Sequence, residues 1–475
     1  MTRLCSLNMR ILTMTTMALA CAAVLAAPVH AQTLTTHQQL ALDIYKELVE
    51  INTVTATGDT GRAADAMAER LRTAGFDAAD VQVFKPAPRK GHLVARLRGT
   101  GARRPILLLA HLDVVEAKPE DWSVDPFKLI EKDGYFYGRG TGDDKFMAAA
   151  FVANLVRYKL DGYKPDRDII LALDTDEEIF DSNGLGIQWL LKNKRELIDA
   201  EFALNEGAPV ALKKGKPFAV GIQTSEKVPL AYRLEVKNRG GHSSLPTQDN
   251  AIYHLAEGLA RLSKFAFPIK LNETTRAFLE RAAELESPQV GADIRSAISG
   301  APDREALSRL SANPLYNAQL RTTCVATMLE GGHAYNALPQ VARSTVHCRL
   351  LPGEPVDEVK ATLVRVLADP EISVTQIDQP VLSAPSPLNA EIMGAIKTLA
   401  AEFWPGAPVG PIMSTGATDG SFLRNAGIPT YGHSGLAGDM DDVRAHGKDE
   451  RVLVKSFFDG VEYQYRLVKA LAGGK

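Results

Sequence analysis

The sequence predicts an α/β fold built on a mostly parallel sheet, and two observations support that prediction. Residues 106–110 and 168–173 are short apolar runs, each bounded by polar or turn residues and followed by a helix-like segment. That pattern is typical of strands buried in a parallel sheet. The stretch 229–378 instead mixes helices with strands such as 230–237, which alternate apolar and polar residues. We therefore expect a smaller α+β domain inserted into the first.

The elements of the first domain follow from apolar periodicity and from residues that end helices. Apolar side chains recur at helical spacing over 36–53, and a second helix over 62–75 ends at Gly75. We then expect strands over 81–84, 93–98, 106–110, 168–173 and 201–204, and helices over 146–160 and 185–194.

The inserted domain and the return to the first domain are read in the same way. The strands expected in the insert are 230–237, 322–329, 342–350 and 372–377, with helices over 250–262 and 356–368 and a polar, mostly helical stretch over 265–316. The first domain resumes with a helix over 389–403, a strand over 428–431, a loop over 435–449 and a helix over 451–471. The expected boundaries are 32–228 for the first part of the first domain, 229–378 for the insert and 379–475 for the second part.

Residues 1–31 have the composition of an export signal. Arg3 and Arg10 precede a short apolar stretch rich in alanine, and Val29-His-Ala31 has the small residues of a cleavage site. The apolar stretch is too short to form a stable membrane span. We expect the mature protein to be periplasmic or secreted.

Composition excludes several classes of function. The formal net charge is −3 and the chain has no basic block, so neither nucleic acid nor an anionic membrane surface is expected as a partner. Only Cys324 and Cys348 lie outside the leader, which excludes a disulfide-framework protein. If strands 322–329 and 342–350 pair as a hairpin centred near Asn336, the two cysteines face each other within disulfide range.

Histidine and carboxylate side chains follow the expected parallel strands. His111 and Asp113 come after the first strand, and Glu177 and Glu178 come after the second. Further carboxylates occur at a glycine-rich turn (Asp143 and Asp144) and after strand 201–204 (Glu206). Because ligands bind at the carboxyl ends of strands in open α/β sheets, these side chains are expected at one edge. The sequence therefore predicts a metal site there.

Each of these motifs has a simpler interpretation when it stands alone. A single His-x-Asp is more often a hydrogen-bonded pair than a ligand set. The run Thr175-Asp-Glu-Glu178 alone would most often begin a helix. The segment Gly138-Arg-Gly-Thr-Gly142 suggests a phosphate loop, but it matches neither nucleotide motif and two aspartates follow it. The three motifs together, in order and at strand ends, favour the metal site.

Taken together, the motifs resemble the M20 metallopeptidase family of cocatalytic-zinc exopeptidases and amidohydrolases, which includes carboxypeptidase G2, aminoacylase-1 and carboxypeptidase S. The resemblance covers essentially the whole mature chain and rests on His111-Leu-Asp113, Gly138–Lys145, Asp176-Glu-Glu178, Asn205-Glu-Gly207, Gly240-Gly-His242, Asn336 and His446–Glu450. It implies a zinc-exopeptidase catalytic domain with an inserted lid of the dimerisation type.

The resemblance also implies two zinc ions per chain, with cobalt and manganese as alternatives. His111 and Glu206 would hold one ion, and Glu178 and His446 the other. Asp143 would bridge them, and the family pattern makes the Asp143–Asp144 peptide cis. Imidazole and carboxylate are suitable zinc ligands, and five ligands on two ions leave room for water and substrate.

Further roles follow from the same resemblance. Glu177 would act as the general base on a water shared by the two metals, and the Asp113 carboxylate would accept the second N–H of His111. In the lid, His242 and Asn336 would donate to the oxyanion of the transition state. Arg349 is a candidate clamp for a substrate carboxylate, although a solvated strand-end arginine explains it equally well.

The expected function is that of an exported dizinc hydrolase of amide bonds, a carboxypeptidase or dipeptidase acting on small peptides. An N-acyl-amino-acid amidohydrolase is the alternative on the same machinery. An inactive binding protein on a peptidase fold is disfavoured because every ligand and the base are present. A serine hydrolase is disfavoured because the chain lacks a G-x-S-x-G elbow. We expect a homodimer formed through the lid.

Overall fold

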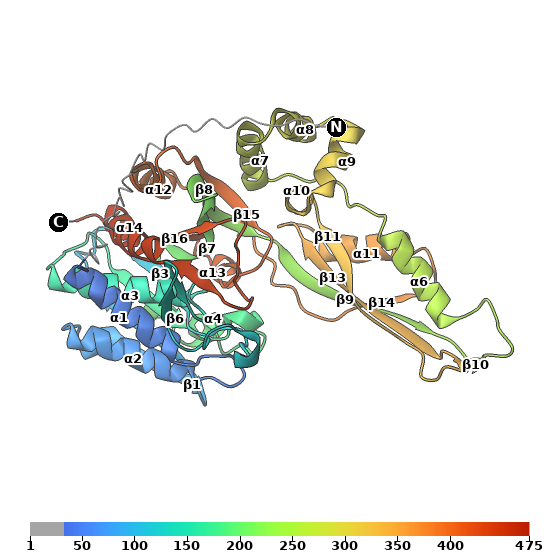
Figure 1. The fold of residues 1–475 in the computed structure, drawn as a ribbon, viewed down its shortest axis with the longest axis horizontal. Coiled ribbons are helices and arrows are strands. Elements are labelled where there is room, and N and C mark those ends of the chain that lie inside the picture. Colours follow the sequence, from blue (N-terminus) through green and yellow to red (C-terminus); the bar gives the residue numbers. More distant parts are fainter. Residues whose placement is uncertain (1–32, 475) are drawn as a thin grey trace, which may run out of the picture. The chain divides into compact units, whose positions relative to one another are not determined.

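The computed structural model describes residues 33–474. The expected signal segment 1–31 lies outside these residues. An eight-stranded sheet forms the centre of the larger domain (Figure 1). Its strand order is β1 (Val81–Ala87), β2 (Lys90–Leu97), β6 (Ile169–Asp174), β3 (Ile106–His111), β7 (Phe202–Lys213), β16 (Thr430–Asp439), β8 (Lys216–Glu226) and β15 (Val409–Ser414).

The central strands of this sheet are parallel, as the apolar runs predict. Strands β6, β3, β7 and β16 pair in parallel, and β8 pairs in parallel with β15. Strands β1 and β2 join the sheet in antiparallel orientation, and β8 runs antiparallel to β7 and β16. The expected mostly parallel α/β domain is confirmed.

Both faces of the parallel strands are buried, which explains why their sequences are continuously apolar. Along β3, Ile106, Leu108 and Ala110 belong to one hydrophobic core, whereas Leu107 and Leu109 belong to another. Successive side chains of a strand point to opposite faces, so one run contributes to both layers. The helices of the first layer are α1 (Thr36–Glu50), α2 (Thr60–Thr73), α3 (Lys145–Leu160), α12 (Ala390–Phe403) and α14 (Val454–Ala472) (Figure 1). Those of the second are α4 (Ile187–Asn193), α5 (Arg195–Ile198) and α13 (Gly420–Asn425).

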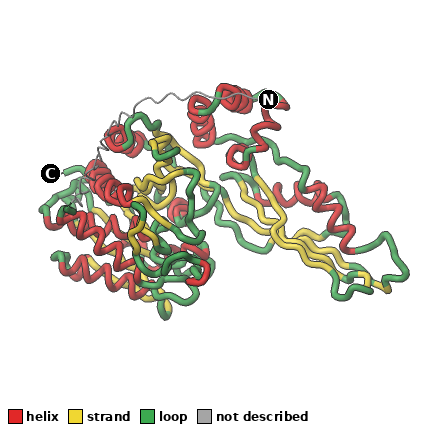
Figure 2. Tube along the Cα trace, viewed as in Figure 1, coloured by secondary structure: helices red, strands yellow, loops and turns green. Residues whose placement is uncertain are grey.

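The lid is a four-stranded antiparallel sheet covered by two helices. Its strand order is β11 (Thr323–Gly331), β13 (Val341–Leu350), β9 (Val228–Lys237) and β14 (Ser373–Gln376), and the covering helices are α6 (Ala251–Leu262) and α11 (Val356–Leu367). Figure 2 shows its long strands running side by side. Leu230, Tyr232, Leu234 and Val236 of β9 point into the core beneath these helices, which explains the alternation in the sequence. The inserted α+β lid is confirmed, while its boundaries at 228 and 378 stay a prediction.

The expected helical stretch 265–316 forms a four-helix insert with a hydrophobic core of its own. It consists of α7 (Glu273–Leu285), α8 (Pro288–Ile298), α9 (Arg304–Ala312) and α10 (Pro314–Leu320). Helix α7 packs on β15, the edge strand of the larger sheet. Although the insert lies between two lid strands in sequence, it contacts the first domain.

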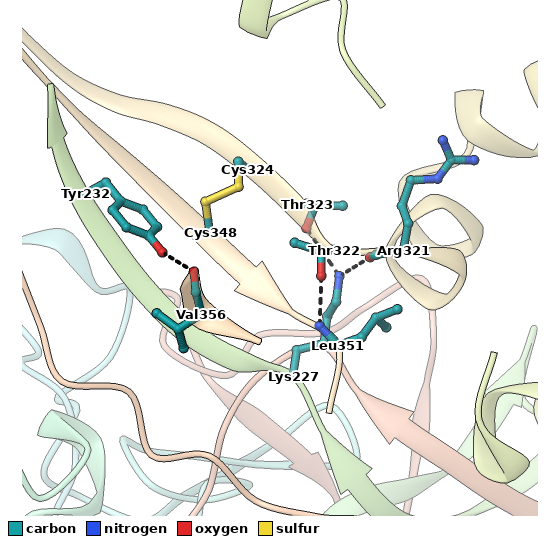
Figure 3. The surroundings of a disulfide bond; sticks show 9 residues. All are labelled: Lys227, Tyr232, Arg321, Thr322, Thr323, Cys324, Cys348, Leu351 and Val356. Atoms are coloured by element: carbon teal, nitrogen blue, oxygen red, sulfur yellow. Dashed lines mark hydrogen bonds between the residues drawn. A yellow bond between two sulfur atoms is a disulfide. The ribbon is translucent and has the colours of Figure 1, made fainter. Parts of the chain in front are cut away.

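Cys324 and Cys348 are bonded as a disulfide between β11 and β13 (Figure 3). They stand directly opposite each other in the antiparallel pairing, as predicted. Close by, the Lys227 ammonium group donates to the carbonyl of Arg321 at 2.8 Å and to the Thr323 hydroxyl at 3.2 Å. Lys227 is the single residue between β8 and β9. This contact therefore ties the start of the lid to the strand that carries Cys324.

Several elements differ from the sequence expectation. Strands β8 and β15 were missed, and β7 and β16 extend well beyond the expected 201–204 and 428–431. Part of the expected loop 435–449 is therefore strand. Residues Arg451–Leu453 form β17, which pairs with β5 (Tyr135–Tyr137) and through it with β4 (Ile130–Lys132), whereas a helix was expected there. Among the described residues, no helix is both long and apolar enough to span a membrane.

Candidate metal centre

The strand order brings three of the predicted motifs to one edge of the sheet. β3 lies between β6 and β7, so the segments that carry His111, Glu177 and Glu206 are neighbours. Glu206 lies inside the long strand β7 and not beyond its end. The β7–β16 pairing is irregular here, because Gly432 and His433 are paired with Asn205 and Ala208. That irregularity leaves Glu206 free of the ladder.

Asp143 is placed between the two predicted histidine ligands. Its Oδ1 lies 3.1 Å from His111 Nε2, and its Oδ2 lies 3.1 Å from His446 Nε2. Glu178 Oε2 is 2.9 Å from His446 Nε2, and Glu206 Oε1 is 4.0 Å from His111 Nε2. All five predicted ligands therefore belong to one cluster, with Asp143 at the position expected of a bridging group.

Two sets of three possible ligands are close enough to share an ion. Ligand atoms of His111, Asp143 and Glu178 lie within 4.8 Å of one another, and so do those of His111, Glu177 and Glu206. The second set includes Glu177, which the sequence analysis assigned to the base and not to a metal. The positions therefore leave the division of roles between Glu177 and Glu178 as a prediction.

The charge of the cluster fits bound cations. Burial and then the neighbouring Glu206 raise the pKa of Glu177 well above its ordinary value, and burial likewise raises the pKa of Glu206. Burial would also raise the pKa of Asp143, but hydrogen bonds from His111 and His446 outweigh it and hold that pKa below its ordinary value. Within residues 33–474, Glu178 Oε1 is buried without a hydrogen-bond partner. Crowded carboxylates and an unpaired buried oxygen are what a divalent cation would stabilise.

The two sides of the cluster differ in exposure. The His111 side chain is 1% exposed, whereas that of His446 is 56% exposed. Hydrogen bonds to Asp143 and then to Glu178 raise the pKa of His446 to about 10. The cluster is therefore open to solvent on the His446 side.

Asp113 supports the cluster in a different way from the one expected. His111 Nδ1 donates to the backbone carbonyl of Asp113 at 2.9 Å, while the Asp113 carboxylate lies 3.7 Å away. That carboxylate instead accepts the backbone N–H groups of Glu177 at 3.2 Å and Glu178 at 3.1 Å, together with the Thr55 hydroxyl at 3.1 Å. The Asp113 backbone therefore takes the His111 N–H, while the Asp113 carboxylate stays within ion-pair distance of the ring. Asp113 holds the turn that carries both glutamates.

That turn is further held by Asp176, which adopts a left-handed backbone conformation with φ of 67°. Its carboxylate forms an ion pair with Lys90 and accepts from Asn183 Nδ2 at 2.8 Å. Glu177 and Glu178 then lie in a short 3-10 turn, Glu177–Ile179. The consecutive glutamates can therefore face different partners.

Glu450 and Arg139 are supporting residues that the sequence analysis did not assign. The Glu450 carboxylate accepts from the backbone N–H groups of Gly140 at 3.0 Å and Gly142 at 2.7 Å, and from Arg139 at 2.7 Å. Arg139 also donates to the carbonyl of Gly447 at 3.0 Å. This buried pair joins the loop before Asp143 to the loop of His446. In the sequence, Glu450 is marked only by its position as the last residue of the motif His446–Glu450.

The peptide bond between Asp143 and Asp144 is cis, as the resemblance implied. Asp144 directly precedes α3. The following Lys145 is fully buried and its ammonium group donates to the carbonyl of Ile51 at 2.9 Å. These contacts attach the Asp143 turn to the first helical layer.

The predicted lid residues lie apart from the cluster in their contacts. His242, in β10 (Gly241–His242), is exposed and its Nδ1 contacts the Ser244 hydroxyl at 2.7 Å. Asn336 is also exposed, and its backbone carbonyl accepts from the backbone N–H of Ser243 at 3.0 Å. Within residues 33–474, neither side chain forms a hydrogen bond or ion pair with the cluster. We call His242 and Asn336 together the lid tip.

Arg349 lies on β13, half-buried, and its side chain has no hydrogen bond or ion pair among the described residues. Burial lowers the pKa of its guanidinium below the ordinary value. An arginine in this setting can bind an anion, and the solvated-arginine interpretation is weakened.

Sequence and structure comparisons agree with these motifs. The model of peptidase family M20/M25/M40 matches residues 107–470, and the chain belongs to this family. It is 31% identical to the human N-fatty-acyl-amino acid synthase/hydrolase PM20D1 over 376 residues, which are 77% of this chain and 74% of the relative. It is 30% identical to the probable carboxypeptidase S-like 2 of Dictyostelium discoideum, covering 77% of this chain and 71% of that protein.

Solved structures support the same fold. An M20 metallo-carboxypeptidase from Sulfolobus solfataricus has a TM-score of 0.67 at 19% identity, covering 90% of this chain and 98% of that one. A Bacillus subtilis protein described as a dinuclear metal-binding M20 peptidase has a TM-score of 0.57 at 13% identity, covering 92% and 98%. The family assignment, the fold and the enzyme class predicted from the sequence are confirmed. The chain is an M20 metallohydrolase that acts on amide bonds.

Proposed function

We propose that this protein is an exported dizinc amidohydrolase that releases a free amino acid from an N-acyl amino acid. The cluster around Asp143 carries the proposal, because it gathers two histidines and four carboxylates on the accessible edge of the sheet. His111, Glu206, Asp143, Glu178 and His446 would hold the ions. When bound, the two ions would polarise the scissile carbonyl and acidify a nearby water.

Glu177 is the group we assign to proton transfer. Its carboxylate is half-buried in the cluster beside Glu206, within reach of a water held there. It would accept a proton from the attacking water and deliver it to the leaving amine nitrogen. The Asp113 carboxylate orients it by holding the backbone N–H groups of both glutamates.

The substrate assignment rests on Arg349 and on the relatives. A half-buried guanidinium without a partner suits the carboxylate of a C-terminal amino acid, which N-acyl amino acids and peptides share. A relative named for N-fatty-acyl-amino acids, at 31% identity, favours the N-acyl group over the small peptide expected from the sequence. A carboxypeptidase on small peptides is the second candidate, favoured by the carboxypeptidase S-like relative.

The lid tip requires either lid closure or a second copy of the chain to reach the cluster. Strand β11 is the edge of the lid sheet, and Val325, Met328 and Leu329 on it are 58% to 68% exposed. An exposed apolar edge strand favours pairing with another chain. We therefore propose a homodimer through the lid in which His242 and Asn336 complete the partner's site.

Export is proposed from the composition of residues 1–31. The disulfide between Cys324 and Cys348 supports it, because disulfides persist mainly in oxidising compartments. Fractionation of the source cells, with the mature N-terminus sequenced, would test this assignment. Protein retained in the cytoplasm with residues 1–31 intact would contradict it.

The activity is tested with a panel of N-acyl amino acids and dipeptides, with metal content measured on the same sample. We expect about two zinc-like ions per chain, loss of activity with a chelator and faster cleavage of N-acyl amino acids. Amidation of the substrate carboxylate should raise KM, and Arg349→Gln should remove that difference. Arg343→Gln is the matched control, because Arg343 is on the same strand but pairs with Glu235 at 2.6 Å. Full activity in metal-free protein would overturn the proposal.

A further inference from the structure

A cavity of about 430 Å³ lies between the helical insert and the edge of the large sheet. Phe278 and Ala282 of α7 and Leu315 of α10 line one side, and Val220 of β8 and Pro411 and Met413 of β15 line the other. Its volume is within the range of small-molecule sites, about 300–1,000 Å³. None of the five predicted metal ligands lines it.

One charged side chain of the cavity wall has no partner. Arg281 of α7 lines the cavity, and among the described residues its guanidinium makes no hydrogen bond or ion pair. Its Nε is buried without an acceptor. Burial lowers the pKa of the group below its ordinary value, yet an arginine stays charged at neutral pH. The wall therefore carries a positive charge that has no ion-pair partner among the described residues, although the Glu284 carboxylate on the same helix is near enough to favour the charged form.

The guanidinium lies flat against the backbone of β15. A Cβ placed on Gly410 would come within 2.4 Å of Arg281 Nε and 2.6 Å of its Cζ. Gly410 therefore leaves room for the guanidinium in this position, and a larger residue there would displace it.

Gln319 of α10 provides a second unsatisfied group in the same wall. Its Nε2 donates to the carbonyl of Met413 at 2.9 Å, which orients the amide. The side chain is 2% exposed, and its Oε1 has no partner within residues 33–474. Leaving a buried acceptor unpaired costs about 1–3 kcal/mol, and only a donor such as a water molecule would satisfy it. Gln319 therefore does not select the charge of an occupant. The acid in the lining, Glu286, already accepts from the Tyr316 hydroxyl at 2.6 Å.

We propose that this cavity binds a single-chain amphiphile with an anionic head group, namely an alkyl carboxylate, whose head pairs with Arg281 and whose chain lies among the apolar side chains. The site is separate from the metal centre, and the proposal does not depend on which amide the enzyme cleaves. Charge complementarity selects the carboxylate, because a cationic or neutral head would leave the guanidinium unpaired. Its occupant would join the insert to the sheet.

The test compares three head groups on one chain length with the zinc-loaded enzyme. Laurate, dodecanol and dodecyltrimethylammonium are titrated by calorimetry below their micelle-forming concentrations. We expect laurate to bind about tenfold or more tightly than the cationic probe, which corresponds to about 1.4 kcal/mol. Arg281→Gln should weaken the binding of laurate by about tenfold and leave the affinity for dodecanol unchanged. Arg281→Lys should retain part of the preference for laurate over the cationic probe.

Two further variants separate this site from other binding. Arg276→Gln is the matched control, because Arg276 is on α7 but donates to the carbonyl of Ile298 at 3.1 Å. Ala211→Phe should fill the cavity and weaken the binding of both laurate and dodecanol, while the zinc content stays unchanged. Equal laurate affinity in the wild type and Arg281→Gln would overturn the proposal, since binding would then be at the metal centre or elsewhere. An equal loss in Arg276→Gln, or no saturable binding, would overturn it too.

Discussion

The metal centre and the lid tip contain residues that the family pattern assigns to one active site, but they are held in different ways. His111, Asp143 and Glu178 are fixed by contacts within the larger domain and lie within 4.8 Å of one another. His242 and Asn336 are exposed, and their contacts are local to the lid. The first region is therefore assembled by one fold, whereas the role proposed for the second requires a lid movement or a partner chain.

The largest expected effect separates the two adjacent glutamates of the metal centre. Glu177→Gln keeps shape but cannot accept a proton, so turnover should fall by about 10²- to 10⁴-fold while both metals stay bound. Glu178→Gln removes a charged ligand, so it should lower metal content, and added zinc should restore part of the activity. Metal analysis and kcat on the same preparations make the comparison. Loss of zinc in Glu177→Gln with retention in Glu178→Gln would reverse the two roles.

At the lid tip, His242→Ala should lower kcat by about 10²- to 10³-fold without changing metal content, because one oxyanion donor is lost. Mixed dimers of His242→Ala and Glu178→Gln should regain activity if the lid of one chain completes the site of the other. Activity is measured after the two variants are mixed and the heterodimer is verified. Verified heterodimers without rescue would instead assign His242 to its own chain.

Removing the disulfide should affect the lid and spare the metal centre. Cys324 and Cys348 close a loop with a sequence separation of 24. Loop-closure entropy for that length corresponds to about 3 kcal/mol of stability. Cys324→Ala/Cys348→Ala should lower the free energy of unfolding by this amount, and with it the urea midpoint, while zinc content stays the same. Reduction of the wild type should reproduce the loss, and an unchanged midpoint would contradict the prediction.

The remaining effects are opposite pH dependences in the two domains. Burial lowers the pKa of His433 in β16 from 6.5 to about 4. Between these values the unfolded chain binds a proton that the folded chain does not, so stability should fall by about 3 kcal/mol as pH drops through this window. His254 in the lid has a raised pKa because of its hydrogen bond with Asp369. Its contribution is present below pH 6.5 and is lost as pH rises through the raised pKa.

Urea unfolding over a pH series checks both signs. His433→Gln should flatten the acid side of the profile, because His433 is neutral between the carbonyl of Gly221 and the hydroxyl of Tyr463, both at 2.8 Å. His254→Gln should flatten the neutral-to-alkaline side. Profiles of both variants that parallel the wild type would contradict this assignment.

The sequence predicted the central strands and the order of the ligands because both depend on short-range patterns. The runs at 106–110 and 169–173 are apolar throughout, which is typical of a strand buried on both faces. Strand β8 was missed because its end is polar. Thr224, Ser225 and Glu226 are buried, and Glu226 is satisfied by Thr418 at 2.8 Å and Arg424 at 2.7 Å. Those partners are almost two hundred residues away in the chain, so no local pattern indicates burial.

By itself the sequence determined which residue types meet at the edge of the parallel sheet, because strand ends and their following residues are local. Tertiary structure alone decided what each side chain contacts there. The Asp113 carboxylate accepts from the glutamate turn, while the Asp113 backbone carbonyl accepts from His111. Glu450 joins the loops of Asp143 and His446. In the tertiary structure α7 of the insert also packs on β15, which leaves Arg281 without an ion-pair partner beside a cavity. The physical reason is that side-chain direction and hydrogen-bond partners depend on segments far apart in sequence, which adjacent residues do not specify.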